Sequence, residues 1–240
     1  MPISKTAVIA GVGSGLGASL ARKFAKEGCR VGLLARSLEF IDSLAAELKR
    51  GGTDAVGLMA DIANPAQVSR AFEQIRGKLG TVDILVHHAS AGGPFNRGLL
   101  DTAPEDFERA WRVSAYGALL CCQQVVPDML RREEGAILFT GATSSVRGAA
   151  LAFSSAKFAV RGLAQALARE LWPKGIHVAH VVIDGIIGEP QGRNTSLPAA
   201  GEPLLDPDAI ADSYWNLVTQ DKSAWSLEVD VRPYREKFFE

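Results

Sequence analysis

The segment from Gly11 to Gly17 has the glycine content of a phosphate-binding turn. It follows an apolar run at residues 6–10 and precedes a stretch with helical patterning, so we expect a strand, a tight turn and a helix start. Glycine lets backbone N–H groups approach a phosphate closely, and a helix N-terminus favours an anion. The sequence therefore predicts a pyrophosphate site, the alternative being a glycine-rich turn that binds nothing. The residues proposed to form the site are Gly11, Gly13, Ser14, Gly15, Leu16 and Gly17.

The spacing of these glycines distinguishes two kinds of dinucleotide-binding turn. The pattern G-x-G-x-x-G fails, because Leu16 stands where its third glycine should be. The pattern G-x-x-x-G-x-G fits through Gly11, Gly15 and Gly17. In this respect the chain resembles the short-chain dehydrogenase/reductase superfamily, and the resemblance extends over about residues 4–190.

The end of the second expected strand, at residues 30–35, is where such folds recognise the adenosine ribose. A carboxylate there would bind the ribose hydroxyls of NAD and repel a 2′-phosphate. This chain has Arg36 and Ser37 instead. Arginine offers a charged planar fork to a phosphate, and serine adds a donor. We therefore expect NADP(H) to be favoured over NAD(H), the alternative being a solvated arginine at a strand end.

The resemblance assigns further positions to the cofactor. Asp61 corresponds to an aspartate that binds the adenine amino group, although it competes for the role of capping the helix that begins at Pro65. The run from His87 to Ser90 stands where the superfamily has Asn-Asn-Ala-Gly, and paired histidines suggest a metal, but no Cys, Asp or Glu nearby completes a site, so none is expected. The cofactor positions beyond the turn are Asp61, Ile62, His88, Ala89, Lys157, Gly185 and Ile187.

Four catalytic positions follow from the same resemblance. In the superfamily a tyrosine transfers a proton, a lysine four residues later assists it, a serine polarises the carbonyl, and an asparagine positions a water relay. A spacing of four places tyrosine and lysine on one helical face. The matching residues here are Phe153, Lys157, Ala142 and Ser114, so only the lysine is retained. Thr143 is a possible substitute for the missing hydroxyl, but aliphatic hydroxyls are poor proton donors near neutral pH.

The elements that position these residues alternate between strand and helix patterns, which is typical of a parallel sheet covered on both faces. We expect a Rossmann-type, doubly wound α/β/α fold of about seven strands, ordered 3-2-1-4-5-6-7, with three helices on each face. Residues 1–240 are expected to form one NAD(P)-binding domain. Residues 184–207 are rich in Gly and Pro and lack periodicity, which predicts a substrate lid or a mobile loop. The remaining strands are expected at residues 6–10, 55–60, 84–87, 136–140, 176–183 and 226–231, and the helices at about residues 38–50, 104–131, 154–172 and 208–220, with others beginning at the glycine turn and at Pro65.

Composition excludes several classes of partner. The 26 Lys and Arg residues balance 27 Asp and Glu residues, so charge gives no reason to expect nucleic acid or an anionic membrane. No apolar run is long enough to cross a bilayer. Cys29, Cys121 and Cys122 have neither metal-ligand nor disulfide spacing, which indicates buried side chains in a reducing setting. We therefore expect a cytoplasmic protein with a small-molecule substrate.

Two of the expected helices carry broad apolar faces, which favour a homodimer or homotetramer. The alternative is that these side chains all pack inward. They are Ala118, Leu119, Cys122, Ala164, Ala168 and Leu171.

Three functions remain compatible with the sequence. The resemblance and Lys157 favour an NADP-dependent oxidoreductase that acts on a carbonyl or alcohol with non-standard catalytic residues. The substitutions at Phe153, Ala142 and Ser114 favour a catalytically weak dinucleotide-binding sensor or regulatory protein. A lyase or isomerase on the same scaffold is the third possibility, since a fold does not decide a function.

Overall fold

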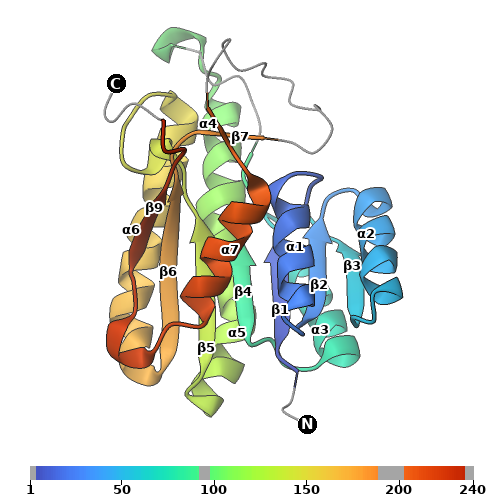
Figure 1. Cartoon of the computed structure of the whole chain (residues 1–240). Helices are drawn as coiled ribbons and strands as arrows, with labels where there is room; N and C mark the ends of the chain where they lie inside the picture. The colour runs from blue at the N-terminus through green and yellow to red at the C-terminus, as the bar shows by residue number, and fades with distance from the viewer. Residues whose placement is uncertain (1–3, 92–97, 189–202, 236–240) are drawn as a thin grey trace.

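The structure is a computed structural model that describes residues 4–91, 98–188 and 203–235. At its centre is a seven-stranded, all-parallel sheet with the order β3-β2-β1-β4-β5-β6-β9 (Figure 1). This confirms the predicted order, with β9 as the seventh strand. The strands of the sheet are β1 (Thr6–Ala10), β2 (Arg30–Ala35), β3 (Ala55–Met59), β4 (Ile84–His87), β5 (Gly135–Thr140), β6 (Ile176–Ile183) and β9 (Glu228–Val231).

Helices cover both faces of this sheet, as predicted (Figure 1). One face carries α1 (Leu16–Lys26), α2 (Leu38–Arg50) and α7 (Pro207–Val218). The other face carries α3 (Pro65–Leu79), α5 (Gly117–Arg132), which continues from α4 (Pro104–Trp111), and α6 (Leu151–Leu171). All residues of β1 and β6 are buried, because a parallel sheet between two helical layers exposes neither face to water.

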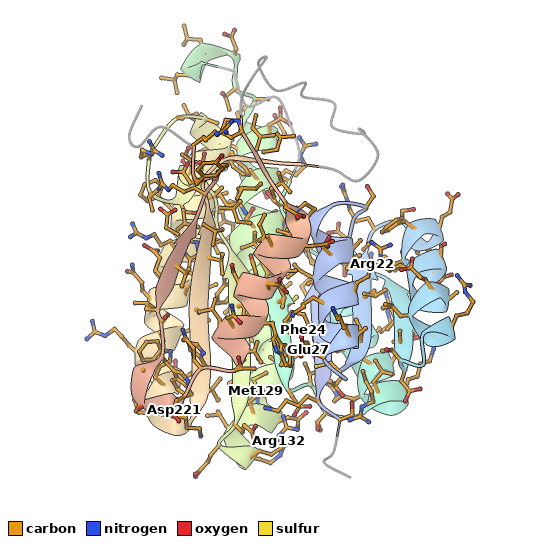
Figure 2. The ribbon with its side chains drawn as sticks, viewed as in Figure 1. Arg22, Phe24, Glu27, Met129, Arg132 and Asp221 are labelled. Carbon is orange, nitrogen blue, oxygen red and sulfur yellow. The ribbon has the colours of Figure 1, made fainter. Side chains whose placement is uncertain are left out.

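The two helical layers pack the sheet into two apolar clusters, one on each face. Phe24 of α1, labelled in Figure 2, is fully buried and meets the ring of Trp215 of α7 edge-on, with 5.5 Å between ring centroids. Cys29, Cys121 and Cys122 are buried, as predicted. Burial raises the pKa of the Cys29 thiol to about 11 and that of Cys121 to about 12, so these thiols are unreactive core side chains.

The long helix predicted for residues 104–131 is interrupted. It runs as α4, passes through one π-helical turn at Arg112–Tyr116, and continues as α5. Such turns are rare and occur frequently at functional sites. The turn contains Ser114, one of the four positions expected to be catalytic.

The apolar helix faces that favoured an oligomer pack mostly inward. Five of the six residues, all except Leu119, are at most 4 % exposed within the single chain. Leu119 is 37 % exposed. Five of the six side chains are therefore buried in the core of a single chain. They do not support an interface, and the homodimer or homotetramer stays a prediction.

The two ends of the segment expected to form a lid are hydrogen-bonded to each other. Strand β7 (Ile186–Ile187) pairs in parallel with β8 (Leu204–Leu205), and the Gly188 N–H donates to the Leu205 carbonyl at 2.8 Å. The residues between these ends, 189–202, lie outside the described part of the chain. Among the described helices, none combines the length and the apolar character that a membrane span requires.

Candidate active site

The glycine turn is attached to the end of the neighbouring strand β2. The backbone N–H groups of Gly11 and Val12 both donate to the Leu34 carbonyl at 2.9 Å. Gly11 has a φ of 100°, and a Cβ there would lie 2.4 Å from the Cα of Ala89. Only glycine fits this position, because the turn passes directly over the residues that follow β4.

The start of α1 has the properties of an anion site. Gly15 is its N-cap and makes no side-chain capping bond, and the first turn holds no acidic residue. A Cβ on Gly13 would meet nothing within 4 Å, so the turn faces open space at that residue. Leu16 is 3 % exposed and its side chain packs into the core. Its contribution to an anion site is therefore its backbone N–H. An uncapped helix N-terminus beside an open glycine turn fits a pyrophosphate.

The two residues expected to recognise a 2′-phosphate lie at the end of β2. Arg36 and Ser37 are both exposed. Ser37 is the N-cap of α2, and its hydroxyl makes no capping bond. Within the described ranges no ion pair involves Arg36. Because the Leu34 carbonyl holds the glycine turn, both side chains start close to that turn.

Asp61 was expected either to bind adenine or to cap the helix that begins at Pro65, and the structure excludes the second role. The cap of α3 is Asn64, whose side chain accepts from the Gln67 N–H at 3.1 Å. The carboxylate of Asp61 instead closes a short turn by accepting from the Ala63 N–H at 2.9 Å. Asp61 is therefore not the helix cap, and Ile62 beside it is buried against Gly117.

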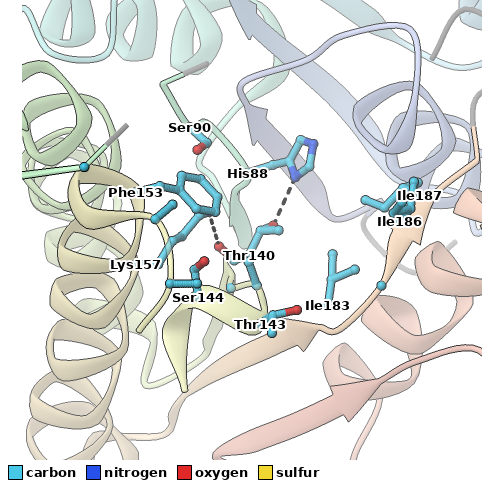
Figure 3. A pocket seen from close by; sticks show the side chains of 16 residues that line it. His88, Ser90, Thr140, Thr143, Ser144, Phe153, Lys157, Ile183, Ile186 and Ile187 are labelled. Atoms are coloured by element: carbon cyan, nitrogen blue, oxygen red, sulfur yellow. Dashed lines mark hydrogen bonds between the residues drawn. The ribbon is translucent and has the colours of Figure 1, made fainter. Parts of the chain in front are cut away.

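A pocket of about 890 Å³ lies at the carboxyl ends of β4, β5 and β6 (Figure 3). This is the edge where strand order reverses between β1 and β4, the usual ligand position in such folds. The pocket brings together seven of the predicted site residues, but neither the glycine turn, Arg36, Asp61 nor Ser114 contributes to its walls. The seven are His88, Ala142, Thr143, Phe153, Lys157, Gly185 and Ile187.

Lys157 is the one expected catalytic position at which the residue is retained, and its side chain is held inside the pocket wall. It is 3 % exposed, and its Nζ donates to the Thr140 carbonyl at 2.9 Å (Figure 3). The same nitrogen lies 5.4 Å from the centre of the Phe153 ring. Burial lowers the pKa of Lys157 to about 8. Phe153 contributes a ring surface and no proton.

Three hydroxyls follow Ala142, and the structure gives each a different partner. Thr143 donates to the buried carboxylate of Asp184. An ionised carboxylate only accepts hydrogen bonds, so the single proton of Thr143 is committed there. Ser145 is buried, and its Oγ accepts from the Ala142 N–H at 3.1 Å. Ser144 is a pocket residue whose oxygen points inward (Figure 3). Thr143 is therefore a poor substitute for the missing serine, and Ser144 takes its place as candidate.

The carboxylate that holds Thr143 is itself held by two arginines. Asp184 Oδ2 lies 2.6 Å from an Nη2 of Arg147 and 2.8 Å from that of Arg232. The sequence alone assigned no role to Asp184. The ion pairs join β6, the loop before α6 and the segment after β9, which stiffens one wall of the pocket.

Ser114 is buried and does not line the pocket. Its Oγ is buried and has no hydrogen-bond partner within residues 4–91, 98–188 and 203–235, and the same is true of both ring nitrogens of His87. Burial, followed by the positive charge of Lys157, lowers the pKa of His87 to about 3, so the ring is neutral. Buried polar atoms without protein partners are typically satisfied by water. Among the described residues, no group of three or more His, Cys, Asp or Glu is arranged to hold a metal ion.

Comparison with known proteins identifies the family. The family model for short chain dehydrogenases matches residues 5–192. The glycine betaine reductase ATRR of Emericella nidulans is 32 % identical over 97 % of this chain, which spans 19 % of that protein's length. A crystal structure of a short-chain dehydrogenase from Rhodopseudomonas palustris has a TM-score of 0.81 at 33 % identity and covers 96 % of this chain and 99 % of its own. A metagenomic short-chain oxidoreductase in complex with NADP has a TM-score of 0.80 at 26 % identity, covering 96 % and 98 %. With this match over most of its length, the chain belongs to the short-chain dehydrogenase family.

Proposed function

We propose that this protein is an NADP(H)-dependent oxidoreductase that acts on a small carbonyl or alcohol substrate without the usual tyrosine. The observation that carries the proposal is the position of Lys157. Its side chain is bonded to the Thr140 carbonyl inside a pocket at the same sheet edge as the glycine turn. The relative that was solved with NADP supports the choice of cofactor. Arg36 and Ser37, exposed and uncommitted beside the turn, support it from within the chain.

Each part of the site has a definable role in this proposal. The nicotinamide cofactor, when bound, supplies or accepts the hydride. The glycine turn and the start of α1 bind its pyrophosphate, Arg36 binds the 2′-phosphate, and Lys157 binds the ribose beside the nicotinamide. Ser144 donates a hydrogen bond to the carbonyl oxygen of the substrate. Phe153 holds no proton, so turnover loses the factor of about 10²–10⁴ that general acid–base catalysis typically contributes.

The cofactor part of the proposal is tested by titrating the protein with NADPH and NADH. We expect NADPH to bind more tightly by about 1.5–3 kcal/mol, the value of a charge-assisted hydrogen bond. Arg36→Ala should remove most of this preference and leave NADH binding nearly unchanged. Arg50→Ala, the same change at the far end of α2, is the matched control and should alter neither affinity. Equal affinities in the unmodified protein would show that Arg36 is only a surface charge.

The catalytic part is tested by restoring the missing groups. Phe153→Tyr together with Ala142→Ser should raise NADPH-dependent reduction of simple ketones by orders of magnitude, because Lys157 is already in place. The two single variants show whether the groups act together. Rapid ketone reduction by the unmodified protein, with no loss in Ser144→Ala, would contradict the proposed roles.

A second function, a dinucleotide-binding sensor or regulatory protein, is favoured by one specific observation. Phe153 and Ala142 have no acidic proton to transfer or donate, and the hydroxyl of Thr143 donates to Asp184. This function predicts tight NADPH binding with no measurable turnover of any carbonyl in a broad panel. The same titration and turnover assays therefore decide between the two.

A further inference from the structure

Thr140, at the end of β5, is the centre of a hydrogen-bond chain that leaves the pocket. Its Oγ1 lies 3.2 Å from Nδ1 of His88 and 2.7 Å from the hydroxyl of Tyr214. Its carbonyl accepts from Lys157, so one residue joins three others; Figure 3 shows the bonds to His88 and Lys157. His88 lines the pocket, whereas Tyr214 is fully buried on α7 in the core. These hydrogen bonds thus connect the pocket to the buried side chain of Tyr214, which no ligand can reach.

The proton positions in this chain follow from counting donors and acceptors. Burial raises the pKa of Tyr214, so its hydroxyl keeps its proton. In the described structure that hydroxyl has Thr140 as its single hydrogen-bond partner. A buried O–H without an acceptor costs about 1–3 kcal/mol, so Tyr214 donates to Thr140. The proton of Thr140 is then directed to His88, whose Nδ1 must accept it.

The charge state of His88 agrees with this direction. Burial, and then the positive charge of Lys157, lower the pKa of His88 to about 4. The ring is therefore neutral at physiological pH and carries one proton. Because Nδ1 accepts from Thr140, that proton resides on Nε2.

The backbone of His88 lies beside the glycine turn. The His88 N–H donates to the carbonyl of Ala10, the last residue before the turn, at 2.9 Å. The next residue, Ala89, is the one that a Cβ on Gly11 would strike. The ring nitrogen that is not bonded to Thr140 points away from it (Figure 3). A neutral N–H donor is therefore available at His88, whose backbone contacts the residue before the turn and which lines the same pocket as Lys157.

We propose that Tyr214, acting through Thr140, holds His88 in the tautomer protonated on Nε2, and that this N–H donates to an oxygen of the bound dinucleotide between its pyrophosphate and its nicotinamide. The ligand half of this inference rests on the proposed function. His88 is then a cofactor-binding side chain in its own right, in addition to its backbone. Tyr214 is a positioning residue, since it touches neither cofactor nor substrate.

The tautomer is measured without any ligand, by nitrogen NMR of protein labelled at its 4 histidines. The His88 signals are assigned by their loss in His88→Phe. We expect the unmodified protein to carry the His88 proton on Nε2 alone. Tyr214→Phe should give a mixture of tautomers, because Thr140 can then donate or accept. Thr140→Ser keeps the hydroxyl and should keep the single tautomer, and Tyr116→Phe is the matched control. A proton on Nδ1 in the unmodified protein, or a single tautomer in Tyr214→Phe, would overturn the inference.

The ligand half is measured with two probes, NADPH and adenosine 2′,5′-bisphosphate, which ends at the first phosphate of the pyrophosphate and lacks the nicotinamide half. His88→Phe should weaken NADPH about three- to tenfold by loss of one hydrogen bond. Tyr214→Phe should weaken it about twofold, because about half of the molecules carry the wrong tautomer. Neither variant should change the affinity for the bisphosphate, and Tyr116→Phe should change the affinity for neither probe.

The outcomes separate the two proposals. Unchanged NADPH binding in His88→Phe, or equal weakening of both probes, would overturn the role of the His88 side chain. If neither probe binds the unmodified protein, the proposed function fails, and the ligand half fails with it. The tautomer experiment still decides the role of Tyr214 in that case.

Discussion

Two glycines of the same turn, Gly11 and Gly13, should respond in opposite ways to the same substitution. In Gly11→Ala the new Cβ would lie 2.4 Å from the Cα and 2.5 Å from the backbone nitrogen of Ala89, and φ is 100°. Backbone cannot rotate away as a side chain can. Overpacking of this kind costs about 1–3 kcal/mol, and the left-handed backbone adds about 1–2 kcal/mol. We therefore expect Gly11→Ala to lose a large part of a typical unfolding free energy of about 5–15 kcal/mol.

Gly13→Ala should instead leave the fold intact and impair the ligand site. Its Cβ meets nothing within 4 Å, and its φ is not positive. Replacing glycine at such a position is neutral or stabilises by about 0.4–1 kcal/mol, because the unfolded chain loses freedom. The same methyl group projects into the space proposed for the pyrophosphate.

The pair is compared by urea unfolding and by NADPH titration. We expect a lower urea midpoint with an unchanged slope for Gly11→Ala, and a normal midpoint with much weaker NADPH binding for Gly13→Ala. The reasoning would be refuted if the two variants had equal stability, or if Gly13→Ala bound NADPH as tightly as the unmodified protein. The first result would mean that the approach to Ala89 relaxes at no cost. The second would place the pyrophosphate elsewhere.

Three further predictions concern the pocket. Because burial lowers the pKa of Lys157 from 10.5 to about 8, the folded chain releases this proton at lower pH than the unfolded chain, so its contribution to the unfolding free energy rises between about pH 8 and 10.5. The unfolding free energy of the unmodified protein minus that of Lys157→Met should therefore increase with pH by up to about 3 kcal/mol. A difference that does not change with pH would exclude a depressed pKa. In the Phe153→Tyr background, Ser144→Ala should reduce ketone turnover more than Thr143→Val; the reverse order would show that Thr143 leaves its carboxylate partner during turnover. Asp184→Ala should lower the unfolding free energy by about 2 kcal/mol, less than a fully buried pair because Arg147 is partly exposed, and unaltered unfolding in urea would show that its ion pairs contribute nothing.

The order of the sheet was predictable because each of its determinants is local. Alternating runs of strand and helix pattern require a parallel sheet, and the handedness of the crossovers then leaves few possible orders. The glycine turn and Lys157 were predictable for a related reason. Both belong to short contiguous patterns whose chemistry depends on spacing along one turn or one helical face.

The alternatives that the sequence left open were decided by side-chain direction. Asp61 and Asn64 both precede α3, and only the observed bond to the Gln67 N–H identifies Asn64 as its cap. The apolar residues of α5 and α6 suit an interface between chains as well as they suit a core. Burial within one chain assigned five of the six to the core, because the sheet and the neighbouring helices cover them.

The sequence by itself determined the fold, the glycine turn, the lysine and the absence of the tyrosine. Only the tertiary structure decided which pocket hydroxyl is bonded to a carboxylate and which other groups are joined by hydrogen bonds. Thr143 and Ser144 are neighbours with similar chemistry, and the difference between them is Asp184, which the fold brings from 41 residues away. The bonds of Thr140 to His88 and Tyr214 cross 52 and 74 residues of sequence. Such contacts leave no periodic signal along the chain, because they depend on the pairing of β5 with β4 and on a helix from the far end of the sequence.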